Sequence, residues 1–515
     1  MFRPKLNSLI LFILFASATA IAFWHSSINQ PLVDIHDFRQ TQTALTTFFL
    51  NPVDLQTLLN YETPVFGKPW SIPMEFPTYQ FLAFHMQSLT LFDLDKSGRL
   101  VSLLFGVLVI LPVIGIMRIF KINDKGIFSF ILLYLTSGIY LYWNRTFMIE
   151  STSLFFSILT IYLYLLIRND FTTLKYNRIH LTNTLLLNSS LFFSLTISLL
   201  TKPTTSLPVL SLIGLDIIYT VFTAFISRRH PVHEVITLNF VLKSIAVLSS
   251  IFLLFAWINY ADSLKEMNEI GIDLTSQNLR AWNYGTIEQR FSKDLWLDVV
   301  IDRMFTYIGF LPALLLLFSG VRSKSMSNSQ RIFVFLNLYL TFLPLLVFTN
   351  LHIRHNYYQS ANQIYLLISL ATCFSVIRTK TYFNSITLLI TLFVIGSYVH
   401  FYNAYYKYAY IETNEQLEIG EIINTNTTSD SAIMIFGADW NPAIAYHSKR
   451  KALYLPGEDN PKADTFLANS DRYLGQLNLG AIVTKMDLDS NVLNNQCPAF
   501  RKRLVNDWEI YICNR

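Results

Sequence analysis

The sequence predicts an α-helical polytopic membrane protein with about eleven transmembrane helices and a C-terminal α/β domain. Three observations predict this class. The chain is 52% hydrophobic and only 14% charged, whereas a soluble domain carries about a quarter charged residues. Apolar runs of membrane-span length recur as far as residue 402. Basic residues gather in every second loop between these runs.

The N-terminus combines a basic stretch with an apolar run, a pattern that a secretory signal peptide shares. The segment "ASATA" even resembles a cleavage site. We favour a retained first helix, because Trp24 at its end makes a natural interfacial anchor.

A helix needs about 20 apolar residues to cross a bilayer. Runs of this kind predict spans near 7–24, 99–119, 127–143, 151–167, 183–200, 204–226, 240–259, 302–319, 331–349, 361–377 and 383–402.

Alternate loops differ in charge, which predicts the orientation. One set is basic and nearly free of acidic residues, and the positive-inside rule places it in the cytoplasm: "RPK", "MRIFKINDK", "RNDFTTLKYNR", "SRRH", "VRSKSMSNSQR" and "IRTK". All eight tryptophans fall on the opposite side or at its interface. We therefore expect a bacterial-type cell (inner) membrane protein with a cytoplasmic N-terminus and a first outer loop at 25–98.

The tail at 403–515 differs from the transmembrane domain at 1–402. It alternates strand-like and helical stretches, such as "SAIMIFGA" and "GAIVTK", and predicts a mixed α/β domain outside the cytoplasm. Cys497 and Cys513 both lie there, and a disulfide and two buried thiols are equally open for them. Cys373 lies in a predicted span and is expected to serve packing.

Polar residues are predicted to converge on the outer membrane surface, where ionisable groups are costly and usually functional. They begin the first outer loop, recur within it and fill three later outer turns: Asp34, His36, Asp37, Arg39, Glu75, Arg145, Glu150, Lys202, His352, Arg354, His355, Tyr357, Tyr358 and Gln359. Carboxylates together with cations suit a reaction that needs a base and must hold an anion.

Structural roles are open for the same residues. Asp37 with Gln40 three positions later is a capping-box pattern. Glu150 fits a carboxylate that satisfies a helix dipole, and Lys202 fits a lysine that snorkels. The "HIRHNYY" run fits an interfacial aromatic belt.

Several function classes are disfavoured. The sequence has no basic stripe with interleaved aromatic residues, which disfavours nucleic-acid binding. It also has no CxxC pair, which disfavours a zinc site or redox chemistry. Cytoplasmic nucleotide-sugar chemistry is also disfavoured, because the ionisable residues are predicted on the outer side of the membrane. A lipid-linked saccharide transporter or flippase should carry its charges at mid-depth, with repeat symmetry. A polysaccharide polymerase or ligase stays a rival, because Arg280 and Arg290 lie in a late outer loop.

Five segments, in this order, resemble the GT-C superfamily of membrane glycosyltransferases: "HDFRQTQTA", "EFPTYQFLAFHMQSLTLFDLDKSGRLVSLLFG", "RTFMIESTSLFF", "LLTKP" and "RHNYYQ". The likeness covers residues 5–402 and is strongest to the bacterial group around the aminoarabinose (lipid A) and protein O-mannosyl transferases. The first segment is similar to the H-x-W-R-Q-x-D-T-A opening of many bacterial members. Here Gln42 replaces the common aspartate, and aligning Arg39 puts His36 at the catalytic acidic position.

The resemblance implies a polyprenyl-phosphate sugar donor and an extracytoplasmic acceptor, which is a glycolipid, polysaccharide or protein. A first-loop carboxylate would act as general base in an inverting displacement. We expect Asp37 in this role, then Asp34, and least of all His36.

The remaining site residues have two expected tasks. Fixed cations would stabilise the leaving phosphate: Arg39, Lys202, Arg354 and His355. Other side chains would position the substrates: Gln40, Glu75, Glu150, Tyr357 and Tyr358. A divalent cation (Mg or Mn) held by Asp37 and Glu150 is a further expectation.

Overall fold

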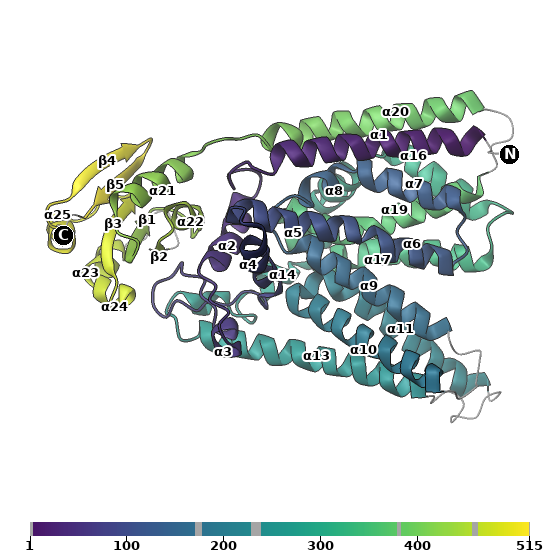
Figure 1. Cartoon of the computed structure of the whole chain (residues 1–515), viewed down its shortest axis with the longest axis horizontal. Coiled ribbons are helices and arrows are strands. Elements are labelled where there is room, and N and C mark those ends of the chain that lie inside the picture. Colours follow the sequence, from purple (N-terminus) through teal and green to yellow (C-terminus); the bar gives the residue numbers. More distant parts are fainter. Residues whose placement is uncertain (1–3, 170–177, 228–237, 378–382, 456–461, 514–515) are drawn as a thin grey trace.

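The structure is a computed structural model that describes residues 4–169, 178–227, 238–377, 383–455 and 462–513. A bundle of long helices makes up most of the molecule, and a small α/β domain lies beyond one of its ends (Figure 1). The helices α1 (Pro4–Ser27) and α20 (Phe383–Ala404) run side by side along one edge of the bundle. The ring of Phe23 packs edge-on against Phe401 between them, so the first and last long helices are neighbours.

Helices cover all eleven predicted spans. Besides α1 and α20, the bundle consists of α5 (Leu94–Leu108), α6 (Ile110–Ile119), α7 (Asp124–Thr136), α8 (Gly138–Trp143), α9 (Glu150–Asn169), α10 (Arg178–Thr201), α11 (Pro203–Ser227), α13 (Leu238–Lys265), η3 (Asp294–Phe305), α16 (Phe310–Arg322), α17 (Asn328–Val347) and α19 (Gln359–Val376). Among the described residues, six helices are long and apolar enough to cross a membrane by length and composition alone, or seven if η3 and α16 form one span. The chain is a multi-pass membrane protein.

Two of the predicted spans are interrupted, so the prediction of one continuous helix for each was wrong. The span at 302–319 consists of η3, a π-helix, and α16, which meet at 80°. Gly309 between them has a φ of 82°, a conformation that glycine adopts without strain, and it ends the helical path. The span at 127–143 breaks at Ser137, whose extended backbone separates α7 from α8.

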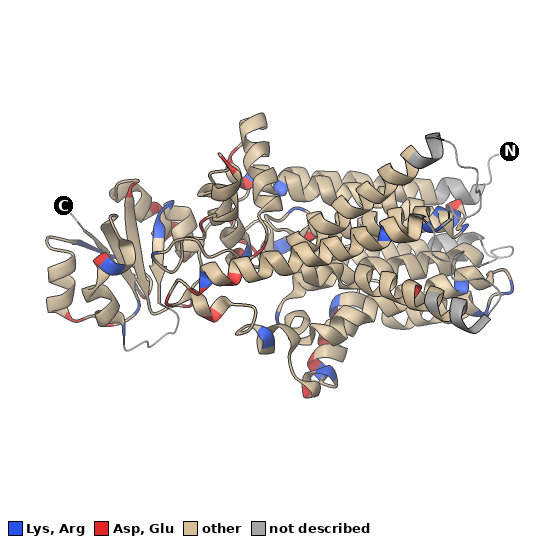
Figure 2. Cartoon of the chain, turned by 90° about the horizontal axis from the view of Figure 1, so that it is seen from below, with Lys and Arg blue, Asp and Glu red and all other residues tan. Residues whose placement is uncertain are grey.

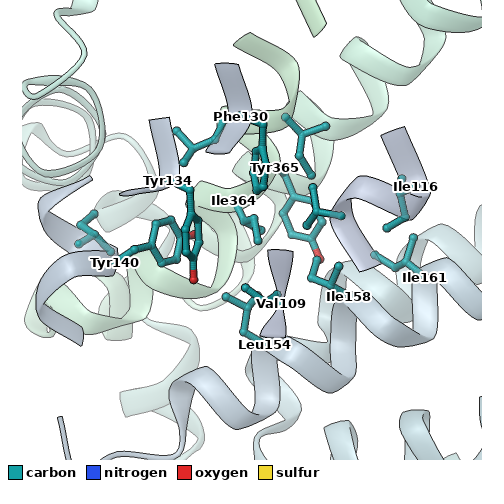
Figure 3. Packing of buried hydrophobic residues seen from close by; sticks show 14 of the residues in the cluster. Val109, Ile116, Phe130, Tyr134, Tyr140, Leu154, Ile158, Ile161, Ile364 and Tyr365 are labelled. Atoms are coloured by element: carbon teal, nitrogen blue, oxygen red, sulfur yellow. The ribbon is translucent and has the colours of Figure 1, made fainter. Parts of the chain in front are cut away.

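Aromatic rings pack among aliphatic side chains in the buried core of the bundle (Figure 3). Tyr134 and Tyr140 stack with ring centroids 4.2 Å apart, although they come from α7 and α8 on either side of the break at Ser137. The hydroxyl of Tyr134 donates to the carbonyl of Gly106 on α5, which satisfies the buried polar end of this ring. The break therefore contributes to the core.

The two ends of the bundle differ in the charged residues that they carry. Lys and Arg gather at the end remote from the α/β domain, while acidic and basic side chains mix at the junction with that domain (Figure 2). The predicted basic loops "RNDFTTLKYNR", "SRRH" and "IRTK" lie largely outside the described residues. The remote end is the one that the positive-inside rule assigned to the cytoplasm.

The first outer loop covers the end of the bundle that faces the α/β domain. It contains α2 (Asp37–Phe48), α3 (Leu55–Leu59) and α4 (Thr78–Thr90). Short helical elements from later loops lie at η2 (Gly271–Leu274), α14 (Arg280–Tyr284), α15 (Ile287–Arg290), α18 (Thr349–Arg354), η4 (Asn356–Tyr358) and η5 (Tyr406–Tyr408).

The tail domain is a five-stranded mixed sheet with helices. Its elements are α21 (Glu415–Asn426), β1 (Ser431–Phe436), α22 (Ala443–Ser448), β2 (Lys451–Tyr454), α23 (Ala463–Ala468), α24 (Ser470–Leu474), β3 (Asn478–Thr484), α25 (Ser490–Gln496), β4 (Arg501–Val505) and β5 (Trp508–Ile512). The strand order is β2-β1-β3-β5-β4, with β1 parallel to β2 and β3, and β5 antiparallel to its neighbours. Cys497 and Cys513 form a disulfide, which decides between the two alternatives left open. Cys373 is a free, buried thiol in α19.

The first outer loop extends the tail sheet at its β2 edge. Phe66 forms an antiparallel bridge with Leu453, and the backbone N–H groups of Ala452 and Tyr454 donate to Pro64 and Val65 at 2.9 and 2.8 Å. Buried apolar residues of the loop and of the tail belong to one hydrophobic cluster. Strand addition and a shared core fix the tail domain on the loop.

Candidate active site

The predicted first-loop residues lie at the start of α2, where the outer loop meets the bundle. His36 precedes this helix and takes a left-handed backbone conformation with a φ of 56°. Its Nε2 atom lies 2.9 Å from Oδ1 of Asn356, and its ring packs edge-on against Tyr357 at 5.0 Å between centroids. Burial lowers the pKa of His36, so the ring is neutral at pH 7.

The capping-box prediction for Asp37 and Gln40 was wrong. Asp37 is the first residue of α2, and its Oδ1 accepts from the backbone of Phe38 at 2.7 Å. The side-chain NH₂ group of Gln40 donates to Asp34 and does not reach back to the start of α2. The side-chain oxygen of Gln40 accepts from the backbone N–H of Phe147 at 3.1 Å. The stronger attraction of the buried Asp34 carboxylate accounts for this choice.

The Asp37 carboxylate lies between the bundle and the tail domain. Its Oδ1 accepts from the N–H of Phe38, and the side chain of Asn441 in the tail is near enough to favour its ionised form. Burial nevertheless raises the pKa of Asp37 above its ordinary range. A carboxylate with a raised pKa is suited to accept a proton.

Asp34 has a different environment. Its Oδ2 accepts from Arg145 at 2.6 Å and lies 3.6 Å from Arg99, and all three side chains are almost completely buried. Arg99 also donates to the carbonyls of Ser27 and Pro31. The triad therefore joins α1, α5 and the turn before α9, and each charge in it has a partner.

Arg39 and Glu75 connect α2 to the segment before α4. The guanidinium of Arg39 donates to Oε2 of Glu75 at 3.0 Å and to Gln42 at 2.7 Å. The other oxygen of Glu75 accepts from Gln80 at 2.8 Å. This places the Arg39 cation in a fixed position beside the site.

Lys202 and Glu150 form an ion pair between the end of α10 and the start of α9. The Lys202 Nζ atom lies 2.6 Å from Oε1 of Glu150 and is only 3.9 Å from the ring centroid of Tyr358 and 5.0 Å from that of Tyr357. The second oxygen of Glu150, Oε2, is buried without a hydrogen-bond partner. A buried acceptor without a partner is costly unless a ligand satisfies it.

The late loop "RHNYYQ" supplies an aromatic wall. The rings of His355 and Tyr357 stack at 5.3 Å, and His355 meets His36 at 5.6 Å. Burial and nearby cationic groups lower the pKa of His355 to about 4, so it is neutral at pH 7 and is not the fixed cation expected from the sequence. Arg354 is exposed at the end of α18.

Three solved structures share this architecture. A crystal structure of ArnT from Cupriavidus metallidurans bound to undecaprenyl phosphate matches with a TM-score of 0.65 and 11% identity over 98% of both chains. The apo oligosaccharyltransferase from Archaeoglobus fulgidus matches with a TM-score of 0.53 and 14% identity, over 93% of this chain and 69% of that one. The mycobacterial arabinofuranosyltransferase AftD matches with a TM-score of 0.53 and 11% identity, over 98% of this chain and 40% of that one. All three are GT-C glycosyltransferases.

This chain has the GT-C fold. The resemblance predicted from the sequence is thereby confirmed. No protein-family model and no curated protein sequence matches the chain. At these low identities, the structural likeness establishes the GT-C fold, and the chemistry is argued below from the side chains.

The GT-C fold of this chain brings most of the predicted site residues together. His36 and Lys202 both contact Tyr357, and Tyr358 stacks on Tyr357 at 4.9 Å. Sequence reasoning missed the parts played by Arg99, Asn356 and Asn441. Asn356 lies within the "RHNYYQ" segment, whereas no signal pointed to Asn441 as a partner of the first loop.

Metal ligands are sparse in this arrangement. Within the described ranges, no three His, Cys, Asp or Glu side chains lie close enough together to hold a metal ion. The expectation of a divalent cation at Asp37 and Glu150 stays a prediction.

Proposed function

We propose that this protein transfers a sugar from a polyprenyl-phosphate donor to an extracytoplasmic acceptor by an inverting displacement. The observation that carries the proposal is that the Lys202 cation and the His36 ring both contact Tyr357. Asp37, the residue that follows His36 in the sequence, has a raised pKa. Such a transfer needs a base on one face of the sugar and cations for the phosphate that leaves from the other.

Asp37 is the proposed base. Its carboxylate accepts from the N–H of Phe38 and lacks a salt-bridge partner among the described residues. Asp34 is less suited, because Arg145 and Arg99 neutralise it inside the bundle. His36 is also less suited, because Asn356 already contacts its Nε2 atom.

Lys202 and Arg39 are the proposed phosphate-binding cations. Both are held by carboxylates, Glu150 and Glu75, and so need no reorganisation when charge develops on the leaving phosphate. The neutral His355 ring can donate a hydrogen bond to a phosphate oxygen. The exposed Arg354 would meet the donor at the edge of the site.

The remaining groups would position the substrates. The unsatisfied Oε2 of Glu150 is suited to accept a hydrogen bond from a sugar hydroxyl. Glu75, Tyr357 and Tyr358 would line the path of the donor. The side chain of Gln40 is engaged at both ends, so it would support the site indirectly by holding Asp34.

The membrane arrangement belongs to the same proposal. We place the N-terminus in the cytoplasm and the tail domain outside a bacterial-type cell (inner) membrane, in line with the positive-inside rule. The Cys497–Cys513 disulfide suits an oxidising compartment, and so supports this placement of the tail.

Activity of the purified protein with synthetic donors tests the proposal. Wild type should bind undecaprenyl phosphate, seen as thermal stabilisation, and should release it from its glycosyl ester when the acceptor is present. Asp37→Asn should keep this binding and lose turnover, whereas a flippase with the same substitution would keep lipid transport in vesicles. EDTA treatment followed by Mg or Mn tests the divalent cation. Equal turnover by wild type and Asp37→Asn would refute the role of Asp37 as base.

A further inference from the structure

The loop between β1 and α22, residues 437–442, brings the tail domain against the proposed base. It leaves the carboxyl end of β1, which lies between two parallel strands, β2 and β3. Loops at the carboxyl ends of parallel strands commonly carry ligand-binding groups, because the strands end there together. Here this position faces the start of α2.

Aromatic contacts hold the loop in place. The Trp440 ring packs edge-on against Phe38 at 4.6 Å and lies 5.3 Å from Phe66. The backbone N–H of Trp440 donates to Oδ1 of Asp439 at 2.8 Å, which fixes the turn. Trp440 thus joins the loop to the residue that follows Asp37 and to the segment that extends the tail sheet.

Asn441 is oriented by the turn that leads into α22. Pro442 follows it and has no N–H to offer, so the next donor, the N–H of Ala443, bonds to Oδ1 of Asn441 at 3.1 Å. With its oxygen engaged at the start of α22, the Asn441 amide presents its NH₂ group to the Asp37 carboxylate. The turn bond from Ala443 and the packing of the neighbouring Trp440 on Phe38 therefore hold Asn441 beside Asp37.

We propose that Asn441 is a positioning residue for Asp37, so that the tail domain completes the active site. The inference rests on the proposed function, because it takes Asp37 as the base. The Asn441 amide holds the carboxylate in one orientation and favours its ionised form, the form that accepts the proton from the acceptor hydroxyl.

Asn441→Asp separates this role from that of forming the turn before α22. Aspartate forms such a turn as asparagine does, because its side-chain oxygen accepts the bond from Ala443, while the donor that faces Asp37 becomes an acceptor. We expect the acid limb of the kcat/KM–pH profile to move up by about one pH unit, so that activity at pH values below the limb falls about tenfold while the plateau above it is kept. The control is Asn414→Asp, because Asn414 caps α21 by accepting from Leu417 at 2.9 Å. Its profile should equal that of wild type.

A wild-type pH profile in Asn441→Asp would overturn the inference. If wild type itself shows no transfer, or if Asp37→Asn keeps it, the proposed function fails instead. A second measurement needs no activity. The swap Asp37→Asn/Asn441→Asp restores one donor and one acceptor, so it should melt at a higher temperature than Asn441→Asp alone. Melting-temperature changes of the two single variants that simply add up in the swap would also rule out the Asn441–Asp37 contact.

Discussion

Lys202 and Glu150 form a buried ion pair in which the ammonium is 2.6 Å from one carboxylate oxygen, while the other oxygen is left without a partner. The same ammonium lies 3.9 Å from the ring centroid of Tyr358. Charge in this pair is balanced, but the hydrogen-bonding capacity of the carboxylate is not filled. The pair thus joins the start of α9 to the end of α10 and leaves one hydrogen-bond acceptor unfilled.

Replacing Lys202 tests both roles. Lys202→Met should destabilise the protein by about 3–5 kcal/mol, because it leaves the Glu150 carboxylate buried and uncompensated. The double variant Lys202→Met/Glu150→Gln should recover most of this loss, but should not regain thermal stabilisation by undecaprenyl phosphate. Melting curves with and without this lipid measure both effects. Full stabilisation of the double variant by the lipid would show that Lys202 does not bind the phosphate.

Asp34 and Asp37 should respond in opposite ways to the same substitution. Asp34→Asn breaks the pair with Arg145 and should lower the free energy of unfolding by about 3–5 kcal/mol. Asp37→Asn removes a carboxylate whose ionised form burial disfavours, so stability should be unchanged or higher. Turnover in Asp37→Asn should fall on the order of 10²–10⁴-fold. Thermal unfolding, measured together with initial rates, distinguishes the two variants. A stable but inactive Asp34→Asn variant would make Asp34, and not Asp37, the base.

The pH dependence of activity follows from the raised pKa of Asp37. A general base must be ionised, so activity is lost as the pH falls through its folded-state pKa. Because burial raises that pKa, the acid limb of kcat/KM should lie above the pH at which an exposed aspartate titrates, about 3.9. Rates measured from pH 4 upward, at constant ionic strength, locate the limb. A flat profile down to pH 4 would contradict a buried carboxylate base.

The tail disulfide should stabilise the tail domain. Cys497 and Cys513 are 16 residues apart in sequence, and closing a loop of this length contributes about 3 kcal/mol in the chain-entropy model. Cys497→Ser/Cys513→Ser should therefore lower the melting temperature, and dithiothreitol should lower it in wild type but not in the variant. Cys373→Ser is the matched control, since this thiol is free in α19 and its variant should stay sensitive to the reductant.

Much of the fold could be predicted from the length of the apolar runs, because a run of about 20 apolar residues has few alternatives to a helix in a bilayer. Every predicted span contains helix, yet the bend at Gly309 was not predicted. An apolar run shows that a segment is buried, but it does not show whether one helix or two fill the space. The strand β4, "RKRLV", was also missed, because most of its residues are exposed and lack an apolar pattern.

The expected site residues could be named from the sequence, but their partners could not. Sequence order and membrane side were enough to place His36, Lys202 and Tyr357 in one expected group, and these three are in contact. The two arginine partners of Asp34 are 65 and 111 residues away (99 − 34 and 145 − 34), and nothing in a single sequence links such positions. Gln40 illustrates the consequence. Its local pattern indicates a cap, but the tertiary attraction of Asp34 outweighs that preference.

The strand-like segment at 64–67 implies an order of assembly. It leaves the ribosome long before residues 451–454, the only described strand with which it pairs. Until β2 has been made, the backbone groups of this segment that later pair with β2 remain unpaired at the membrane surface. Asp37 also lacks its neighbour Asn441 during this time. The pairing of the first outer loop with the tail sheet is therefore completed late, only after β2 has been made and the tail domain can fold onto the loop.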